Sequence, residues 1–149
     1  MISWKCKFFD ELSNNELYKI LQLRNEVFIV EQKCAYQDLD NKDFFAYHLC
    51  AWENEKLLAY TRLFDLGKSY PEVASIGRVI TSPAYRRKNL GKELMTRSTE
   101  EIYRLFGNVP IKISAQLYLK RFYESFGFVK QGEVYLEDGI DHIAMLKSS

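Results

Sequence analysis

Apolar and polar residues alternate, or apolar residues run together, over several short stretches of the chain, which is typical of strands that face a core. These stretches predict strands at residues 4–9, 73–82 and 111–115, and two strand pairs within 48–65 and 128–146. Short turns at 54–55 and 138–139 divide the two pairs, and Pro83 closes the strand before it. Each pair is therefore predicted to form two consecutive strands.

Three other stretches have the apolar spacing of helices. Ser13 and Glu16 match a capping box and predict a helix that runs to about residue 30. Residues 90–106 repeat apolar side chains at helical spacing, and residues 117–127 predict a third helix that Gly127 ends. The resulting order, β-α-β-β-β-α-β-α-β-β, predicts one α/β or α+β domain over residues 1–149, with helices packed on a single mixed sheet.

Composition narrows the classes of function. The 149 residues are 47% apolar, and 21 Lys and Arg oppose 20 Asp and Glu, so no overall charge draws the chain to nucleic acid or a membrane. No apolar run approaches the roughly 20 residues that span a bilayer, and the first residues do not resemble a signal peptide. Three cysteines without close-pair spacing and two distant histidines predict a cytoplasmic protein with reduced thiols and no metal.

The densest positive charge, at Arg86, Arg87 and Lys88, directly precedes the second predicted helix. The first turn of a helix has N–H groups without partners and a positive dipole end, and both attract a phosphate. Gly91 removes a Cβ where a phosphate would approach the backbone. The spacing fits neither a Walker loop nor a dinucleotide loop, so the chemistry suits a pyrophosphate. The alternative is a solvated charge run at a helix start.

Two segments resemble motifs of the GNAT acyltransferases. Residues 86–91, RRKNLG, are similar to the pyrophosphate loop R/Q-x-x-G-x-G/A, with Asn89 in place of the first glycine. Residues 116–128, QLYLKRFYESFGF, resemble N-x-x-A-x-x-F-Y-x-x-x-G-F, with Gln116 for the asparagine and Tyr123 on the tyrosine. With LRNEVFIVEQKCAYQDLD, IGRVITSP and EDGIDHIAM, they resemble the ElaA-like branch of bacterial GNAT proteins.

This resemblance implies a largely antiparallel sheet, flanked by helices, with a splayed parallel pair at its centre that holds the pantetheine arm of acetyl-CoA. It implies transfer of acetyl from acetyl-CoA directly to a primary amine of a small molecule or peptide. The alternative is a non-catalytic module that binds acetyl-CoA or CoA as a ligand. The implied cofactor-binding residues are Val79, Ile80, Thr81, Arg86, Arg87, Lys88, Asn89, Gly91, Lys92 and Gln116.

Direct transfer requires a polarised thioester carbonyl, a proton for the leaving thiolate and a neutral amine. A backbone N–H near Val79 is expected to polarise the carbonyl. Tyr123 is expected to protonate the thiolate, the alternative being a core aromatic. Arg24 and Glu31 lie on the apolar stripe of the first predicted helix, so we expect Glu31 to handle the amine. A structural Arg24–Glu31 pair, or a helix that ends before Glu31, is the alternative.

Other candidate groups carry weaker signals. His142 is expected to be a buried, hydrogen-bonded histidine, with a role as the base as the alternative. Asp38, Asp40 and Asp43 lack the spacing of a calcium loop and predict a solvated turn, or an acidic rim for a cationic acceptor. Cys34 is expected to be a buried or half-buried thiol. A homodimer and the identity of the acceptor amine are left open.

Overall fold

The computed structural model describes residues 1–86 and 89–149, and their strands form one seven-stranded sheet in the order β1-β2-β3-β4-β5-β7-β6. Only β4 and β5 pair in parallel, and the other neighbours are antiparallel. This confirms the predicted fold class. The strands are β1 (Ser3–Phe8), β2 (Tyr47–Glu53), β3 (Lys56–Phe64), β4 (Ala74–Thr81), β5 (Ile111–Gln116), β6 (Val129–Glu137) and β7 (Ile140–Lys147).

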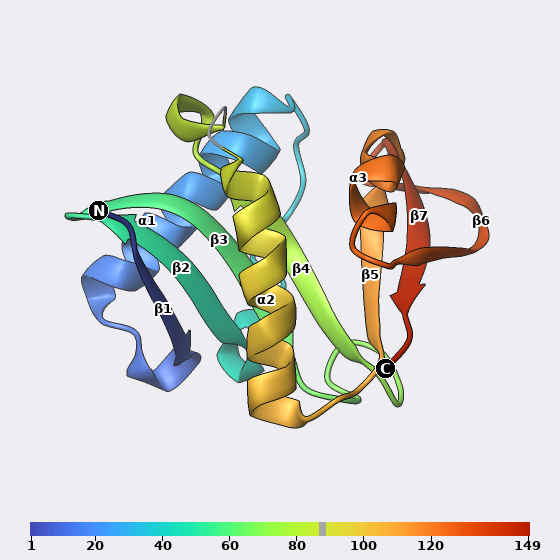
Figure 1. Ribbon diagram of the computed structural model, residues 1–149. Helices are drawn as coiled ribbons and strands as arrows, with labels where there is room; N and C mark the ends of the chain where they lie inside the picture. Colours follow the sequence, from blue (N-terminus) through green and yellow to red (C-terminus); the bar gives the residue numbers. More distant parts are fainter. Residues whose placement is uncertain (87–88) are drawn as a thin grey trace.

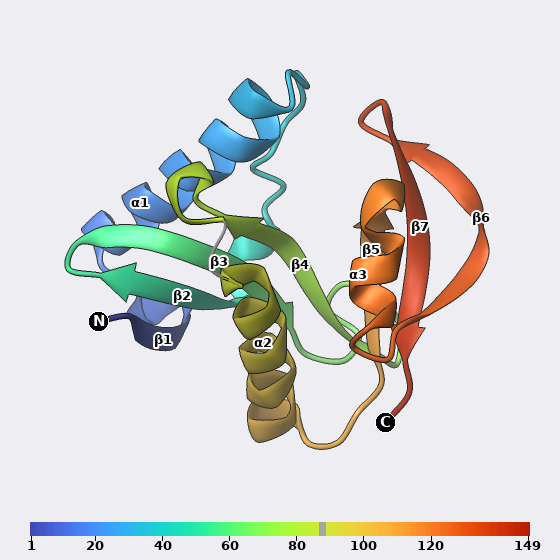
Figure 2. The same ribbon diagram turned by 45° about the horizontal axis from the view of Figure 1, so that its top comes forward.

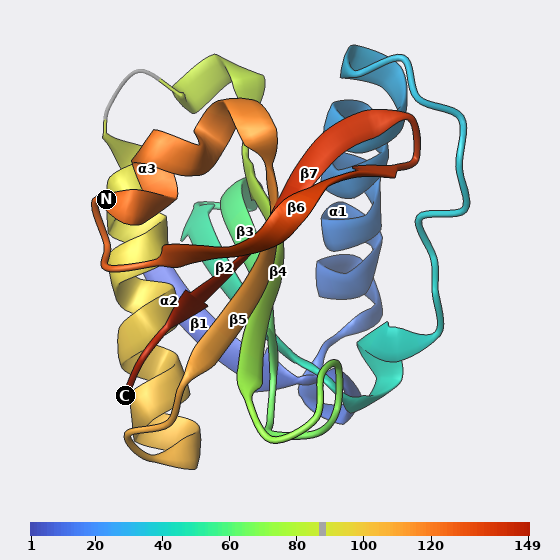
Figure 3. The same cartoon turned by 90° about the vertical axis from the view of Figure 1, so that its right-hand side faces the viewer.

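Helices cover both faces of the sheet. α1 (Asn14–Arg24) lies on one face, and α2 (Leu90–Phe106) and α3 (Lys120–Glu124) lie on the other (Figure 3). α1 continues without a break as the π-helix η2 (Asn25–Glu31), so the helical segment ends within a residue of its predicted end. The shorter 3₁₀ segments are η1 (Phe9–Glu11), η3 (Lys42–Phe45), η4 (Pro83–Tyr85) and η5 (Leu117–Leu119).

The predicted helix ends are present as hydrogen bonds. Ser13 Oγ accepts from the Glu16 N–H at 3.1 Å, and Glu16 Oε1 accepts from the Ser13 N–H at 2.8 Å, which confirms the capping box. After α3, Gly127 adopts φ +93°, and the Phe128 N–H bonds the Tyr123 carbonyl at 3.3 Å. This is a Schellman cap, as Gly127 predicts, although α3 proper starts at Lys120 because the preceding turn is 3₁₀.

Each face of the sheet has its own core. Leu94, Met95 and Ile102 of α2 are fully buried against the sheet in the larger cluster. On the other face, Ile20 and Leu23 of α1 belong to a smaller cluster. Full burial of such a side chain contributes roughly 1.5–3 kcal/mol, so both helices are firmly attached to the sheet.

The centre of the sheet opens between β4 and β5. The two strands pair only at Ala74 with Ile111 and Ser75 with Lys112, and they then diverge (Figures 1 and 2). Beyond that point β5 pairs with β7 alone, so within the described residues the edge of β4 that faces β5 has no strand paired with it from Ile76 onward. The predicted splay is confirmed.

Candidate functional site

A cavity of about 560 Å³ occupies the opening between β4 and β5, with further walls from η2, α3 and the β6–β7 turn. Asn89 and Lys92 are not among its lining residues, and Arg87 and Lys88 lie outside the described part of the chain. The other predicted site residues all line this one cavity: Glu31, Val79, Ile80, Thr81, Arg86, Gly91, Gln116 and Tyr123.

A β-bulge bends β4 where the cavity begins. Tyr60 pairs with Ile80 and Arg62 with Gly77, so Arg78 and Val79 together face one residue of β3. A bulge leaves the extra residue outside the ladder and bends the strand, which accounts for the divergence from β5. Arg78 has φ +49°, a conformation that costs a non-glycine residue on the order of 1–3 kcal/mol.

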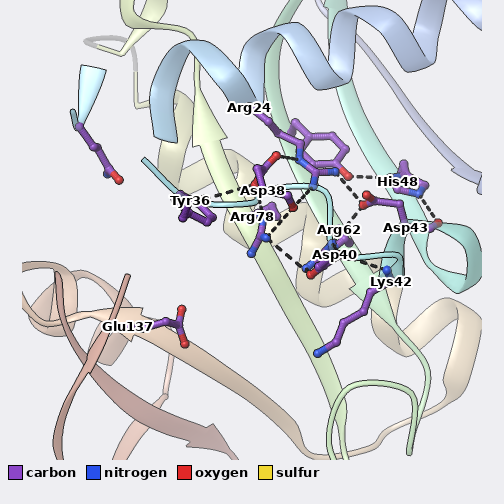
Figure 4. Close-up of polar contacts among 12 residues, drawn as sticks. Arg24, Tyr36, Asp38, Asp40, Lys42, Asp43, His48, Arg62, Arg78 and Glu137 are labelled. Carbon is purple, nitrogen blue, oxygen red and sulfur yellow. Dashed lines mark hydrogen bonds and ion pairs between the residues drawn. The ribbon is translucent and has the colours of Figure 1, made fainter. Parts of the chain in front are cut away.

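Ion pairs hold this strained residue in place. Arg78 Nε donates to Asp38 Oδ1 at 2.7 Å, and Arg78 Nη2 donates to the Asp38 carbonyl at 2.9 Å. Asp38 Oδ2 also accepts from Arg24 Nε at 2.9 Å, and the Arg24 side chain is 0% exposed (Figure 4). The loop after η2 is thereby tied to both α1 and the bulge.

The same network contains two more carboxylates. Asp43, 7% exposed, accepts from Arg24 Nη1 at 2.7 Å and from Arg62 Nη1 at 3.1 Å. Arg62 also forms a bidentate pair with Asp40 at 2.8 and 2.9 Å. Burial opposes ionisation of Asp40, but the hydrogen bonds and charge of Arg62 outweigh it and lower the pKa of Asp40 to about 2.

Three guanidinium groups thus neutralise three carboxylates within this network. The predicted solvated turn at Asp38, Asp40 and Asp43 is wrong, because these carboxylates pair with arginines distant in sequence. An acidic rim made of them is excluded for the same reason. The alternative of an Arg24–Glu31 pair is also wrong, since Arg24 binds Asp38 and Asp43.

Glu31 does not lie on a buried stripe, and that prediction is wrong. Its side chain is 40% exposed and accepts two hydrogen bonds from Arg86, at 2.8 and 2.5 Å, which lower the pKa of Glu31. The reason is the π-helix: its i→i+5 hydrogen bonds widen the turn, so residues after Arg24 leave the α-helical stripe. Glu31 therefore lies at the rim of the cavity, against the predicted pyrophosphate loop.

Tyr123 packs as a core aromatic and also lines the cavity. Its side chain is 5% exposed and forms edge-on contacts with Phe122 and Phe128. Burial raises the pKa of Tyr123, so the phenol keeps its proton at neutral pH. Within residues 1–86 and 89–149 its hydroxyl has no hydrogen-bond partner, which leaves the proton available to a ligand in the cavity.

Two described residues at the start of α2 bear on the predicted phosphate site. Asn89 takes the left-handed conformation, with φ +56°, in place of the usual glycine. A Cβ added at Gly91 would meet only Phe122 Cζ, at an ordinary 3.7 Å. Packing within the described chain therefore does not require a glycine here, whereas a phosphate close to the backbone does.

Two contacts join the walls of the cleft. The side-chain amides of Gln32 and Gln116 pair at 3.3 Å, and Cys34 Sγ donates to the Asp138 carbonyl at 2.7 Å. Cys34 is half-buried, as predicted. Gln116, expected at the cofactor, therefore also fixes the end of η2 to β5.

His142 is 6% exposed, and its Nδ1 bonds the Ile140 carbonyl at 2.7 Å, which confirms a buried, hydrogen-bonded histidine. His142 also lines the cavity, so its burial and its hydrogen bond are compatible with the predicted alternative of a role as the base. Among the described residues, no group of three or more His, Cys, Asp or Glu is arranged to hold a metal. No helix in that part of the chain is long and apolar enough to cross a membrane.

Comparison with known proteins identifies the family. The family model described as "Acetyltransferase (GNAT) domain" matches residues 10–149. This chain belongs to the GNAT acetyltransferase family. It is 42% identical to protein ElaA of Escherichia coli strain K12 over 149 residues, which cover 99% of this chain and 97% of that protein. The resemblance to the ElaA-like branch is thereby confirmed.

Two solved GNAT structures match nearly the whole chain. An acyl-CoA N-acyltransferase from Pseudomonas aeruginosa is 45% identical, with a TM-score of 0.94 over 99% of this chain and 100% of that one. Escherichia coli ElaA is 40% identical, with a TM-score of 0.90 over 98% of this chain and 99% of that one. The GNAT fold and an acyltransferase class that uses a CoA-type co-substrate are therefore assigned to this protein.

Proposed function

We propose that this protein transfers the acetyl group of acetyl-CoA directly to a primary amine of a small molecule or peptide. One observation carries the proposal. Arg86 and Gly91 of the predicted phosphate loop, the open edge of β4 and the buried phenol of Tyr123 line a single cavity. Its volume of about 560 Å³ lies within the usual range for ligand sites, about 300–1,000 Å³.

The chain offers complementary groups along the length of acetyl-CoA. Arg86 and the first turn of α2 supply positive charge for the pyrophosphate. The free edge of β4 at Val79, Ile80 and Thr81 presents backbone groups to the amides of the pantetheine arm, as a sheet edge does to a peptide. Lys92 in the first turn of α2 adds positive charge on the phosphate side, and Gln116 borders the arm.

The geometry supports a role for Glu31 on the cofactor side in place of the predicted role with the amine. Its carboxylate accepts hydrogen bonds from the guanidinium of Arg86, the same group that would bind a phosphate. Binding of acetyl-CoA would exchange one anion for another at Arg86. Glu31 thus holds Arg86 in position and competes with the cofactor.

The chemistry then follows from the placement of Val79 and Tyr123. The amine lone pair forms the C–N bond, and the bulge frees a backbone N–H near Val79 to stabilise the charge on the carbonyl oxygen. As the C–S bond breaks, Tyr123 gives its proton to the sulfur, and the proton that the nitrogen loses restores the phenol. General acid catalysis of this kind contributes about 100-fold or more.

The test measures binding and turnover on the full chain. Acetyl-CoA should raise the melting temperature, and a panel of primary amines should release free CoA with formation of the acetylated amine, detected by mass spectrometry. Stabilisation without turnover of any amine would support the non-catalytic alternative. Absence of stabilisation would contradict the cofactor site itself.

A further inference from the structure

One end of the cavity is bordered by a polar wall on the strands β5, β7 and β6. The register pairs His142 with both Gln116 of β5 and Tyr135 of β6, so these side chains share one face. Glu137, two residues after Tyr135, lies on the same face. Ser114, Glu137 and His142 all line the cavity.

A chain of hydrogen bonds orients the carboxylate of Glu137. Ser114 Oγ donates to Glu137 Oε1 at 3.2 Å, and the Tyr135 hydroxyl bonds Ser114 Oγ in turn. The carboxylate extends into the space opposite Tyr36 and Arg78 (Figure 4). In the described part of the chain, no lysine or arginine lies within 4.0 Å of it, and only His142 Nε2 approaches, at 3.5 Å.

The charge of this wall is therefore uncompensated, in contrast to the other carboxylates of the cavity. Glu31 is paired with Arg86, and the aspartates behind Arg78 are neutralised. Glu137 and the adjacent Asp138 line the cavity without a guanidinium or ammonium partner among the described residues. An anion on a cavity wall attracts a cation from solution.

His142 provides a second and independent feature. Its Nδ1 must carry the proton, because the Ile140 carbonyl can only accept. The other nitrogen, Nε2, then has a free lone pair, makes no hydrogen bond within residues 1–86 and 89–149, and faces Glu137 in the cavity. A proton taken up by Nε2 would place an imidazolium beside the Glu137 carboxylate.

We propose that this wall is the acceptor subsite, where Glu137 binds the ammonium of a cationic alkylamine and His142 Nε2 takes its proton. The inference rests on the proposed acetyl transfer. Because Glu137 and Asp138 repel anions, the acceptor carries no carboxylate that reaches this wall. A diamine or the lysine side chain of a peptide fits this description, and an amino acid with a free carboxylate does not.

The step balances in protons and electron pairs. The ammonium gives one proton to His142 Nε2, and the nitrogen lone pair then forms the C–N bond while the C–S bond breaks. Tyr123 supplies the proton of the CoA thiol, and the second proton lost by nitrogen returns to the Tyr123 phenolate. His142 releases its proton to solvent, so the products are the amide, CoA and one proton.

The test compares Glu137→Gln with Glu133→Gln, an exposed carboxylate on the same strand that does not line the cavity. The probes are 1,5-diaminopentane and 5-aminopentanoate, which differ only in the charge at the far end. The wild type and Glu133→Gln should prefer the diamine. In Glu137→Gln, kcat/KM for the diamine should fall by roughly 10-fold or more, the value of a hydrogen bond to a charged group. The preference over the anionic probe should shrink, and acetyl-CoA affinity should stay unchanged.

His142→Gln supplies a second readout. Its rate should rise with pH in step with the fraction of neutral amine, because only amine already deprotonated in solution can react. Glu137 and Tyr135 are the titratable groups that face His142 from β6, and Tyr36, Tyr123, Arg78, Glu31 and Asp138 line the same cavity. Calorimetric titration with acetyl-CoA shows whether the fold survives this buried substitution. If the fold is lost, Glu137→Gln alone tests the acceptor subsite.

The outcomes separate the two proposals. If the wild type acetylates no amine, the proposed function fails. If the wild type is active and Glu137→Gln matches Glu133→Gln in rate and preference for both probes, acetyl transfer stands and the acceptor subsite is overturned.

Discussion

The two walls of the cleft use charge in opposite ways. Behind the wall formed by α1, η2 and β4, three arginines are each paired with aspartates of one loop. The wall formed by β5, β6 and β7 carries Glu137, which among the described residues only a histidine approaches. The ion pairs of the first wall hold the backbone bulge at Arg78, whereas the charge of the second wall faces the cavity. Charge that is already paired maintains shape, and charge that is free can act on a ligand.

Breaking the paired wall should cause the largest effect. Arg24→Met leaves Asp38 and Asp43 without their buried partner, so the free energy of unfolding should fall by about 3–5 kcal/mol. Urea denaturation measures this change. Arg104→Met is the control, because its partner Glu101 forms an exposed pair worth about 1 kcal/mol or less. Equal losses in the two variants would contradict a structural role for the network.

Tyr123→Phe should affect chemistry rather than shape, because the ring keeps its contacts with Phe122 and Phe128. The single-turnover rate of acetyl transfer should drop by about 100-fold or more, the usual contribution of a general acid. Affinity for acetyl-CoA and the melting temperature should change little. A wild-type rate in a single-turnover measurement would remove Tyr123 from the mechanism.

Gly91→Ala tests the predicted pyrophosphate site at the start of α2. Within the described chain the added Cβ meets only an ordinary contact, so the melting temperature should not fall. Affinity for acetyl-CoA should weaken by roughly 10-fold or more, as for loss of one hydrogen bond to a charged group. Calorimetric titration measures the affinity, and thermal unfolding measures the melting temperature. Unchanged affinity in the folded variant would refute the pyrophosphate loop.

Glu31→Gln should produce the smallest change, and its direction is informative. The Arg86 pair is exposed, so stability should shift by about 1 kcal/mol or less. Acetyl-CoA should bind more tightly, because a competing anion is removed from Arg86. Unchanged cofactor affinity together with lost turnover of the amine would instead support the acceptor role that the sequence predicted for Glu31.

Local signals in the sequence predicted most of the fold. The Ser13 capping box, Gly127 and the period of each apolar run depend on neighbours in sequence, and the structure confirms them. The π-helix and the bulge at Arg78 could not be predicted, because both depend on packing between distant segments. Both features decide where site residues lie.

The arginine–aspartate network was missed for the same reason. Asp38, Asp40 and Asp43 look like a solvated loop until the fold brings Arg24 and Arg62 to them. Glu137 gave no signal, because one acidic residue before a turn is typical of a hairpin. Only its position on the cavity wall, without an arginine partner among the described residues, distinguishes it from the other carboxylates.

The most direct test of acetyl transfer at this site is acetylation of 1,5-diaminopentane by the protein with acetyl-CoA, measured by mass spectrometry of the amine and by release of CoA. We expect one acetylated diamine for each CoA released, at a rate that Tyr123→Phe lowers by about 100-fold. Acetyl-CoA binding, shown by calorimetry, without any acetylated diamine would contradict the proposed transfer.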